Sequence, residues 1–439
     1  MSSVSVPSAD RTVRDQTGSR AGETGVSGGR RVNEALKTFD VAIVGGGMVG
    51  ASLALALSGT GLAVLLIEGV APDSDAQPSF DDRTTALGNA SRRILQSIGA
   101  WDAIAPYAAA IRTIHVSDAG RFGFARLRAE EQGVEAFGYV AANRVIGRAL
   151  WSKLRDAPGI EIRVPVRTER VELAPDLARL DLVHGDGTPE RVSARLVVAA
   201  DGAHSAVRAA AGIGARVEDY GQVAVVANVA ADRPHDGTAF ERFTSSGPLA
   251  VLPLHDGSYT VVWALTPQRA AEMLALDAAS FLRELQGRFG WRAGRFVRMG
   301  RRASYPLKLT RAEHTVAQRA VLIGNAAQAL HPVAGQGFNL GLRDAAMLAE
   351  ILVDAREDVG AAEPLARFAE WRQTDRRGVI SFTDGLVKLF GDTRPGMSFV
   401  RNLGLLLFDL TPPAKSALAR VSLGFGGPSP RLARGLSLR

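Results

Sequence analysis

Three glycines with a regular spacing directly follow an apolar run near the start of the chain. Gly45, Gly47 and Gly50 form the pattern Gly-x-Gly-x-x-Gly after Asp-Val-Ala-Ile-Val. After a strand, such glycines allow a tight turn, a close approach of the backbone to a pyrophosphate, and close packing of the next helix. Glu68 lies 23 residues after Gly45, where a carboxylate can accept hydrogen bonds from ribose hydroxyls. The pattern predicts a dinucleotide-binding unit and leaves open whether the ligand is NAD or FAD.

The segment around these glycines carries no charge from Val41 to Ile67, a run of 27 residues that is long enough for a transmembrane helix. Six glycines interrupt it, at positions 45, 46, 47, 50, 59 and 61. They separate two apolar runs from a Leu- and Ala-rich run between them. This arrangement favours a strand, a turn, a helix and a second strand, and therefore the start of an α/β domain.

A second buried strand is expected at Leu196–Ala200, and it ends in Asp201 and Gly202. An acid and a glycine in this position ordinarily form a turn and cap the following helix, which we expect to begin near Ser205. From the residues alone, Asp201 is interpreted as structural.

A third strand is expected at 320–324, followed by Asn325 and, after ten residues, by a second group of glycines. Gly335 and Gly337 precede a predicted long helix that runs toward Leu352. Glycines before a helix expose backbone N–H groups at its positive end, which suits a phosphate or the anionic edge of a reduced flavin. An ordinary glycine-rich loop is the alternative interpretation.

The remaining pattern predicts an interrupted α/β domain and a mainly β section. Helical periodicity is found at 90–98 and 145–154. Hairpin signals at 118–120 and 184–187 lie between alternating strands, the first hairpin joining 111–117 to 122–128. An antiparallel sheet is predicted from the runs 223–229, 238–243, 249–254 and 259–265. We expect this sheet to form a second domain that covers a crevice in the first.

Composition and charge exclude several classes of protein. The 439 residues include no cysteine, which excludes thiol nucleophiles, thiolate metal sites and disulfide frameworks. The seven histidines show no metal-ligand spacing. The net charge is +7, but residues 1–37 contribute +2 and residues 391–439 contribute +5, so that the body between them is neutral. We expect no metal site and no nucleic-acid partner.

The two ends of the chain differ from its body. Residues 1–37 are rich in Ser, Gly and Arg without an apolar run, which predicts a disordered leader rather than a secretory signal. An organelle transit peptide is the alternative, and four acidic residues argue against it. Near the other end, Leu403–Phe408 and the basic residues after it predict either a packed helix or an amphipathic surface that reaches a bilayer. We expect a cytoplasmic protein and leave open contact with the inner face of the membrane.

Together, the two glycine motifs and the Asp-Gly strand end identify a family. The chain resembles the aromatic-hydroxylase class of FAD-dependent monooxygenases, and within it the ubiquinone-biosynthesis hydroxylases, over roughly residues 38–425. It is most similar to those members that act on 2-polyprenyl-6-methoxyphenol. The matching blocks are 40–56, 82–87, 198–205, 239–243, 247–250 and 324–344.

The resemblance implies an α/β fold with a Rossmann-like FAD-binding domain, an inserted mainly antiparallel β substrate domain and C-terminal helices. The FAD-binding domain would be discontinuous, and the substrate domain would be inserted in two pieces. The implied boundaries are 38–110, 140–215 and 300–390 for the FAD-binding domain, 111–139 and 216–299 for the substrate domain, and 391–439 for the C-terminal helical region.

The resemblance also implies roles for individual residues. Gly45, Gly47 and Gly50 would lie at the FAD pyrophosphate, with Glu68 on the ribose. The further implied contacts with FAD are Arg83, Arg144, Asp201, Gly202 and Asn325, and along the isoalloxazine Gly335, Gln336, Gly337 and Asn339. Asn325 stands where the wider class has Asp, and its amide can still donate and accept hydrogen bonds. His331 is the candidate catalytic base, with a structural donor as the alternative role.

The implied reaction uses FAD, NADPH or NADH as reductant, and O2 as co-substrate. Reduced FAD would form a C4a-hydroperoxide, and its distal oxygen would be transferred to a polyprenylated methoxyphenol ring. Accessory proteins of quinone biosynthesis are possible partners. Three alternatives remain open: another FAD enzyme acting on a soluble aromatic or a prenyl lipid, a flavin-binding protein without turnover, and an NAD dehydrogenase. The Gly335–Gly341 block disfavours the dehydrogenase.

Overall fold

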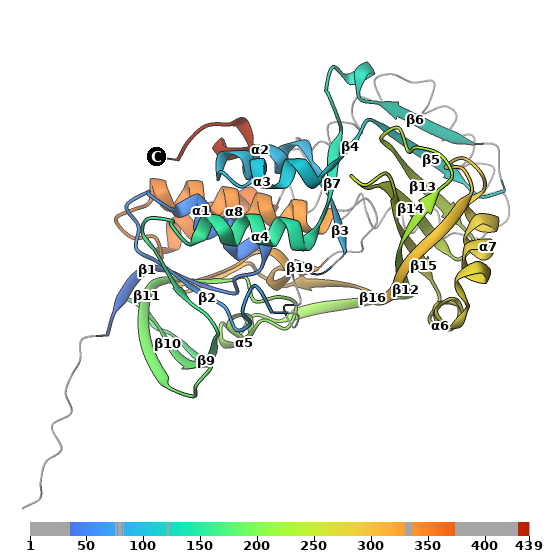
Figure 1. The fold of residues 1–439 in the computed structure, drawn as a ribbon. Coiled ribbons are helices and arrows are strands. Elements are labelled where there is room, and N and C mark those ends of the chain that lie inside the picture. The colour runs from blue at the N-terminus through green and yellow to red at the C-terminus, as the bar shows by residue number, and fades with distance from the viewer. Residues whose placement is uncertain are drawn as a thin grey trace, which may run out of the picture. The chain divides into compact units, whose positions relative to one another are not determined.

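The first sheet has a parallel core that begins with the glycine-motif strand. The computed structural model describes residues 36–74, 77, 81, 83–120, 123–329, 336–373 and 429–438, except for the side chain of Gln336. The strand order is β17-β18-β11-β1-β2-β8, and β18, β11, β1, β2 and β8 are mutually parallel (Figure 1). These strands are β1 (Thr38–Val44), β2 (Val64–Ile67), β8 (Ile160–Arg163), β11 (Pro189–Ala199), β17 (Val316–Ala317) and β18 (Ala320–Leu322). β9 (Val166–Leu173) and β10 (Ala178–His184) extend the sheet as an antiparallel ribbon on β11.

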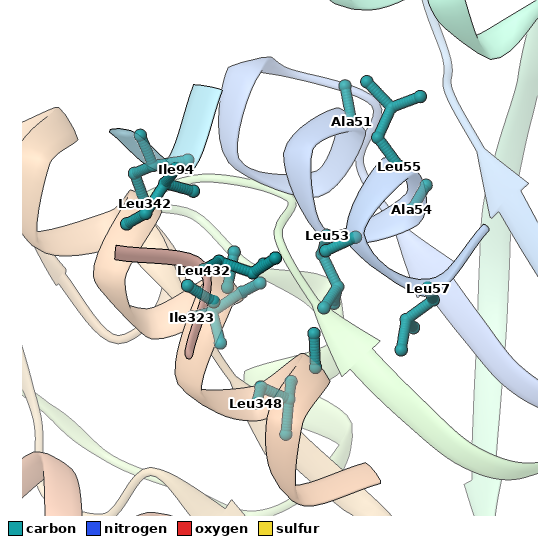
Figure 2. Close-up of a cluster of buried hydrophobic side chains, with 14 of the residues drawn as sticks. Ala51, Leu53, Ala54, Leu55, Leu57, Ile94, Ile323, Leu342, Leu348 and Leu432 are labelled. Carbon is teal, nitrogen blue, oxygen red and sulfur yellow. The ribbon is translucent and has the colours of Figure 1, made fainter. Parts of the chain in front are cut away.

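Helices cover the first sheet and bury most of its apolar surface. One core joins α1 (Met48–Leu57), α2 (Asn89–Ser97), α3 (Trp101–Ile104), α4 (Asn143–Leu154), α8 (Gln336–Asp354) and the terminal turn η5 (Arg431–Arg434). Figure 2 shows Leu53 and Leu57 of α1 gathered with Ile323, Leu348 and Leu432. A second core includes the strand faces turned toward α5 (Ala206–Ala210). The near-continuous apolar runs of β1, β2 and β11 follow from this burial on both faces.

The second sheet is mainly antiparallel and has the order β19-β16-β12-β15-β14-β13-β5-β6. Its strands are β5 (Thr113–Asp118), β6 (Phe124–Arg128), β12 (Ala215–Ala231), β13 (Thr238–Thr244), β14 (Gly247–Pro253), β15 (Tyr259–Leu265), β16 (Phe296–Ala312) and β19 (Gln328–Ala329). Two helices, α6 (Pro267–Ala275) and α7 (Ala278–Phe289), pack on one face of this sheet and form its apolar core with it (Figure 1). The pattern of the sequence did not predict these two helices.

A third, three-stranded sheet has the order β3-β7-β4, with β3 (Thr84–Gly88), β4 (Ala109–Ile111) and β7 (Gly138–Ala142). The prediction of one strand over 111–117 was wrong at its start, because Ile111 belongs to β4 and β5 begins at Thr113. Between them, the Arg112 N–H donates to the carbonyl oxygen of Gly237 at 2.8 Å. At this point the chain passes from the small sheet to β5, which lies next to the edge strand β6 of the second sheet.

A long two-stranded ribbon links the two larger sheets. β12 and β16 have 17 residues each and pair from Ala215–Ala312 to Ala231–Phe296, far beyond the predicted run 223–229. β16 therefore passes through residue 300 without a break, and the predicted domain boundaries stay predictions. The described elements also include short 3-10 turns at Ala105–Tyr107 (η1), Glu130–Gln132 (η2) and Gly324–Ala326 (η3), and a helical stretch at 362–373.

The predicted α/β class, with a Rossmann-like sheet and a mainly antiparallel second sheet, is confirmed. The leader and the apolar C-terminal segment at 403–408 lie outside the described residues. Among the residues that are described, no helix is both long and apolar enough to cross a bilayer. The uncharged run 41–67 is instead β1, the glycine turn, α1 and β2.

Candidate active site

The first glycine motif forms a cradle at the carboxyl end of β1. Gly45 has a φ of +103°, and a Cβ atom there would lie 2.5 Å from the carbonyl oxygen of Ala200. A Cβ on Gly50 would lie only 1.9 Å from the carbonyl oxygen of Gly45. Both positions therefore require glycine. Gly47 is the N-cap of α1, and the first turn of this helix has neither a side-chain cap nor an acidic residue. The N-terminus of α1 thus presents backbone N–H groups and a partial positive charge, which suit an anion.

Glu68 follows β2 and lies beside this cradle. Its Oε2 accepts a hydrogen bond from the Gly46 N–H at 2.7 Å, and its Oε1 accepts one from the Val70 N–H at 2.8 Å. Each carboxylate oxygen keeps a further lone pair for a ligand hydroxyl. The Trp151 indole also contacts this loop, because it donates to the carbonyl oxygen of Gly46 at 2.9 Å. Sequence periodicity placed Trp151 in a helix but gave no sign of this contact.

Asp201 and Gly202 end β11, next to the glycine loop. Asp201 Oδ2 accepts from the N–H groups of Ala206 and Val207, at 2.8 and 3.4 Å, which are the first two of α5. The N-cap residue of this helix is Ser205, near which the helix was predicted to begin. Its Oδ1 is buried and has no hydrogen-bond partner among the described residues. A buried carboxylate oxygen without a donor is costly, so a ligand hydroxyl or N–H group would complete this site.

The end of β18 and the start of α8 close the same edge of the sheet. Gly324 has a φ of +56°, and a Cβ atom there would lie 3.2 Å from the Val49 side chain of α1. A Cβ atom on Gly341 of α8 would lie 3.2 Å from the Gly324 Cα. Asn325, the next residue, is exposed at this edge. The Gly324 N–H donates to Asp344 Oδ2 at 3.1 Å, which ties the turn to α8. Because the parallel strands end together here, Gly45, Glu68, Asp201 and Asn325 follow their carboxyl ends, the usual ligand-binding edge of such sheets.

Asp344 also forms a buried ion pair that the sequence did not suggest. Its Oδ1 accepts from Arg372 Nε at 2.5 Å, and both side chains are at most 2% exposed. Gln328 donates to Asp344 Oδ2 at 2.9 Å. Asp344 thereby fixes the positions of the β18 turn, α8 and the helical residues 362–373 relative to one another.

Arg83 and Arg144 are brought together by the loop before β3. Asp81 accepts from Arg83 Nε at 2.5 Å through its carboxylate and from the Arg144 N–H at 3.1 Å through its carbonyl oxygen. The Arg83 guanidinium also lies over the Tyr305 ring, 4.7 Å from its centroid. Tyr305 is on β16, so this cation–π contact joins the arginine pair to the second sheet.

Asn339 of α8 is 3% exposed and makes structural hydrogen bonds. Its Oδ1 accepts from the Gly88 N–H at 2.9 Å and from Ser91 Oγ at 2.6 Å, and its Nδ2 donates to the carbonyl oxygen of Ala86 at 2.8 Å. The amide therefore holds α8 against β3 and α2. Gly337 lies in the first turn of α8, whereas His331, Gly335 and the side chain of Gln336 lie outside the described residues.

The cradle fits FAD on three independent observations. Glycine is required by contact distances at two positions of the loop, the N-terminus of α1 has no competing acid, and a buried Asp201 oxygen has no described partner. These features suit the pyrophosphate and the hydroxyl groups of a dinucleotide. The individual contacts assigned to the predicted residues stay predictions.

A cavity of about 560 Å³ opens beside Arg144, between the small sheet and the second sheet. Its lining includes Thr84 of β3, Val140 of β7 and Asn228 of β12. At its outer side, Tyr107 and His255 face each other edge to face with ring centroids 5.8 Å apart. A cavity with mixed apolar and polar walls and this volume can hold a small aromatic ligand.

The face of the second sheet opposite α6 and α7 is mainly apolar, and near its middle it contains the carboxyl group of Glu241. Phe240 packs edge to face on Phe289 of α7, so the next residue, Glu241, points to the opposite face. The strand pairing places a row of partly exposed side chains across this face: Val116, Glu241, Ala250, Val262 and Val226. By the same alternation, Tyr305 and Asn228 belong to this face. Through Tyr305 this face therefore contacts Arg83, and through Asn228 it borders the cavity.

The carboxyl group of Glu241 has an unusual environment. Burial among apolar neighbours raises its pKa to about 7, although solvent reaches part of the side chain. The desolvated carboxylate is disfavoured because no described cation compensates its charge. Such a pKa lets a carboxyl group take up or release a proton near neutral pH. The residue pattern predicted the strand but not which of its side chains face away from α6 and α7, because these two helices were not predicted.

Comparison with known proteins agrees with this architecture. Residues 38–383 match the family model of the FAD binding domain. The chain is 38% identical over 428 residues to the ubiquinone hydroxylase UbiL of Rhodospirillum rubrum, with 96% of this chain and 98% of that one covered. It is 34% identical over 400 residues to 3-demethoxyubiquinol 3-hydroxylase of Escherichia coli, with 88% and 98% covered. The solved structure of p-nitrophenol 4-monooxygenase PnpA from Pseudomonas putida has the same fold, with a TM-score of 0.74 at 21% identity over 89% and 99% of the two chains.

The glycine cradle, the second sheet and these matches define an FAD-dependent aromatic monooxygenase. FAD is its cofactor, and a nicotinamide reductant and O2 are typical of the class. Within that class, the chain belongs to the FAD-dependent hydroxylase family of ubiquinone biosynthesis. The expected family is confirmed, and the NAD-dehydrogenase alternative is set aside.

Proposed function

We propose that this enzyme hydroxylates the phenol ring of a polyprenylated ubiquinone precursor, with NADPH or NADH as reductant. The names of the matched relatives refer to ubiquinone or demethoxyubiquinol hydroxylation, and they support this substrate class. The observation on which the proposal depends most is the mainly apolar face of the second sheet with the desolvated carboxyl group of Glu241. An apolar ring and chain would cover such a face, and one polar group would orient the ring hydroxyl.

FAD would be held by the glycine cradle, with Glu68 and Asp201 on its hydroxyl groups and Arg83 and Arg144 farther along it. When bound, it supplies the chemistry of hydride acceptance and O2 activation, which no side chain can provide. The protein contributes binding, orientation and the exclusion of water. Asp344 contributes indirectly, because it fixes the turn that carries Asn325.

Glu241 would bind the phenol hydroxyl and accept its proton. Withdrawal of that proton onto a Glu241 carboxylate oxygen makes the ring more electron-rich, which favours attack on an electrophilic oxygen. A group with a pKa of about 7 can return the proton after the reaction. His331 stays a predicted alternative base outside the described residues.

The size of the row supports a substrate larger than a single ring. Neighbouring strands lie about 4.8 Å apart, so the row from Val226 on β12 to Val116 on β5 crosses roughly 19 Å. Between these ends the row contains Val262, Ala250 and Glu241. This length would accommodate a ring together with the first part of a prenyl chain.

The test is the rate at which NADPH reduces the bound flavin, followed by loss of its visible absorbance. We expect a short-tailed 2-prenyl-6-methoxyphenol to accelerate this reduction strongly and to appear as a hydroxylated product. If flavin binds but the phenol changes neither rate nor product, the substrate assignment is wrong, and a related FAD monooxygenase acting on another aromatic becomes the better description. The participation of accessory proteins and the choice between NADPH and NADH remain predictions.

A further inference from the structure

The end of the second sheet where α7 passes into β16 is strongly basic. Residues 283–302 contain seven arginines and one glutamate, a net charge of +6, although residues 38–390 as a whole are neutral. The exposed arginines of this segment are Arg283, Arg288, Arg292, Arg295, Arg298 and Arg301. Only Arg295 has an ion-pair partner among the described residues, Asp232 at 3.8 Å. The charge is therefore concentrated in one segment of the chain, and ion pairs compensate little of it.

Two large apolar side chains are exposed within the same segment. Trp291 is 66% exposed and Val297 is 48% exposed. Trp291 lies in the loop between α7 and β16, directly beside Arg292. An exposed tryptophan with surrounding arginines is the combination found at membrane–water interfaces, where the ring enters the headgroup region and the cations meet anionic lipids.

This surface is joined to the mouth of the cavity by the loop that follows β12. Arg233 Nη2 donates to the carbonyl oxygens of Trp291 and Arg292, at 2.5 and 3.1 Å. Two residues farther along, the His235 ring lies within hydrogen-bonding distance, 2.8 Å, of the carbonyl oxygen of Leu254, which lines the cavity. The strand pairing also places these residues at one end of the second sheet. β12 and β14 end there, and β15 and β16 begin there.

We infer that the surface formed by Trp291, Val297 and the arginines of residues 283–301 docks on an anionic lipid bilayer and places the cavity mouth at the membrane. The charge sign, the exposed indole and the adjacent cavity all point to this partner. Nucleic acid offers the same charge but no apolar layer for Trp291 and Val297. The role of this surface in the reaction rests on the proposed lipid substrate. Binding of the protein to the membrane can be measured without turnover.

The experiment is co-flotation of the full-length, FAD-loaded protein with vesicles of phosphatidylcholine, with or without phosphatidylglycerol. The test variant carries Arg288→Gln, Arg295→Gln and Arg298→Gln, none of which we place in the active site. Each basic residue near an anionic surface contributes about 1 kcal/mol, so removal of three should weaken partition by on the order of 100-fold. A control with Arg167→Gln, Arg170→Gln and Arg216→Gln removes the same charge from other exposed positions.

We expect wild type and control to float with the anionic vesicles, the test variant to remain in the soluble fraction, and raised salt to release all of them. A separate Trp291→Ala variant should bind more weakly at constant charge. The inference is overturned if wild type does not bind anionic vesicles, if it prefers duplex DNA to them, or if test and control variants bind alike.

Reduction of flavin by NADPH in the presence of a soluble short-tailed phenol reports on the proposed function separately. If a variant no longer floats but its flavin is reduced as in wild type, only the docking surface is affected. If the protein floats but the phenol does not accelerate flavin reduction, the substrate assignment is wrong.

Discussion

Replacement of Glu241 by glutamine tests both the burial and the chemistry of this carboxyl group. Burial raises its pKa from an ordinary value of 4.5 to about 7 in the folded protein. The folded state therefore holds the proton more tightly than the unfolded state does. The associated stability is fully present below pH 4.5 and is lost as the pH rises through about 7. Each pH unit of difference corresponds to 1.36 kcal/mol, so ionisation should cost the wild type about 3 kcal/mol at about pH 8.

Glu241→Gln has the same shape and no proton to lose. We expect it to unfold with nearly the wild-type free energy in weakly acidic solution, and to be more stable than wild type by up to about 3 kcal/mol at about pH 8. The measurement is urea unfolding of the FAD-loaded protein across this pH range. Glu357→Gln, at an exposed position beyond α8, is the matched control and should keep the pH dependence of wild type.

The same variant should bind FAD normally but hydroxylate the phenol about 100-fold to 10,000-fold more slowly, the usual loss when a general base is removed. NADPH consumption and hydroxylated product, measured together, separate slow hydroxylation from failed reduction. Equal free energies of unfolding for wild type and Glu241→Gln at every pH would refute the reasoning about burial. Unchanged product formation would refute the role as base.

Three further substitutions test the cradle and its supports. Gly50→Ala places a Cβ where the carbonyl oxygen of Gly45 lies 1.9 Å away, so we expect protein without bound flavin, as measured by absorbance per protein. Arg372→Met leaves Asp344 buried without its cation and should lower the unfolding free energy by about 3 to 5 kcal/mol, whereas Arg372→Met combined with Asp344→Asn should recover part of this loss. Asn339→Ala orphans two donors and an acceptor and should cost about 2 to 3 kcal/mol in urea unfolding; an unchanged midpoint would contradict the structural role of that amide.

The sequence predicted the parts of the fold that local spacing determines. The glycine motif, its flanking strands and the four central strands of the second sheet were all predicted, because each depends on a short pattern of apolar residues and turn residues. The start of the helix near Ser205, after the turn at Asp201 and Gly202, was predicted for the same reason. The division between β4 and β5 was missed, since it depends on the Arg112 hydrogen bond to Gly237, a contact distant in the chain.

The missed parts of the site depend on tertiary packing. Nothing in the local sequence distinguishes Glu241 from an exposed strand glutamate until α7 occupies the opposite face. The buried pair of Asp344 and Arg372 brings together two helices, and Trp151 reaches the glycine loop from a helix 105 positions away from Gly46. Such contacts carry no periodic signal. The predicted roles of His331 and Gly335 remain untested because those residues lie outside the described part of the chain.

The ribbon of β12 and β16 should affect how this protein unfolds. Ala312, at one end of the ribbon, belongs to the core of the first sheet, whereas Val225 and Val229, toward the other end, belong to the core beneath α6 and α7. Neither sheet can therefore unravel without breaking strands that run into its neighbour. FAD bound at the first sheet should therefore also stabilise the second sheet, because it binds only the folded protein. We expect saturating FAD to raise the melting temperature of both sheets in a single cooperative transition.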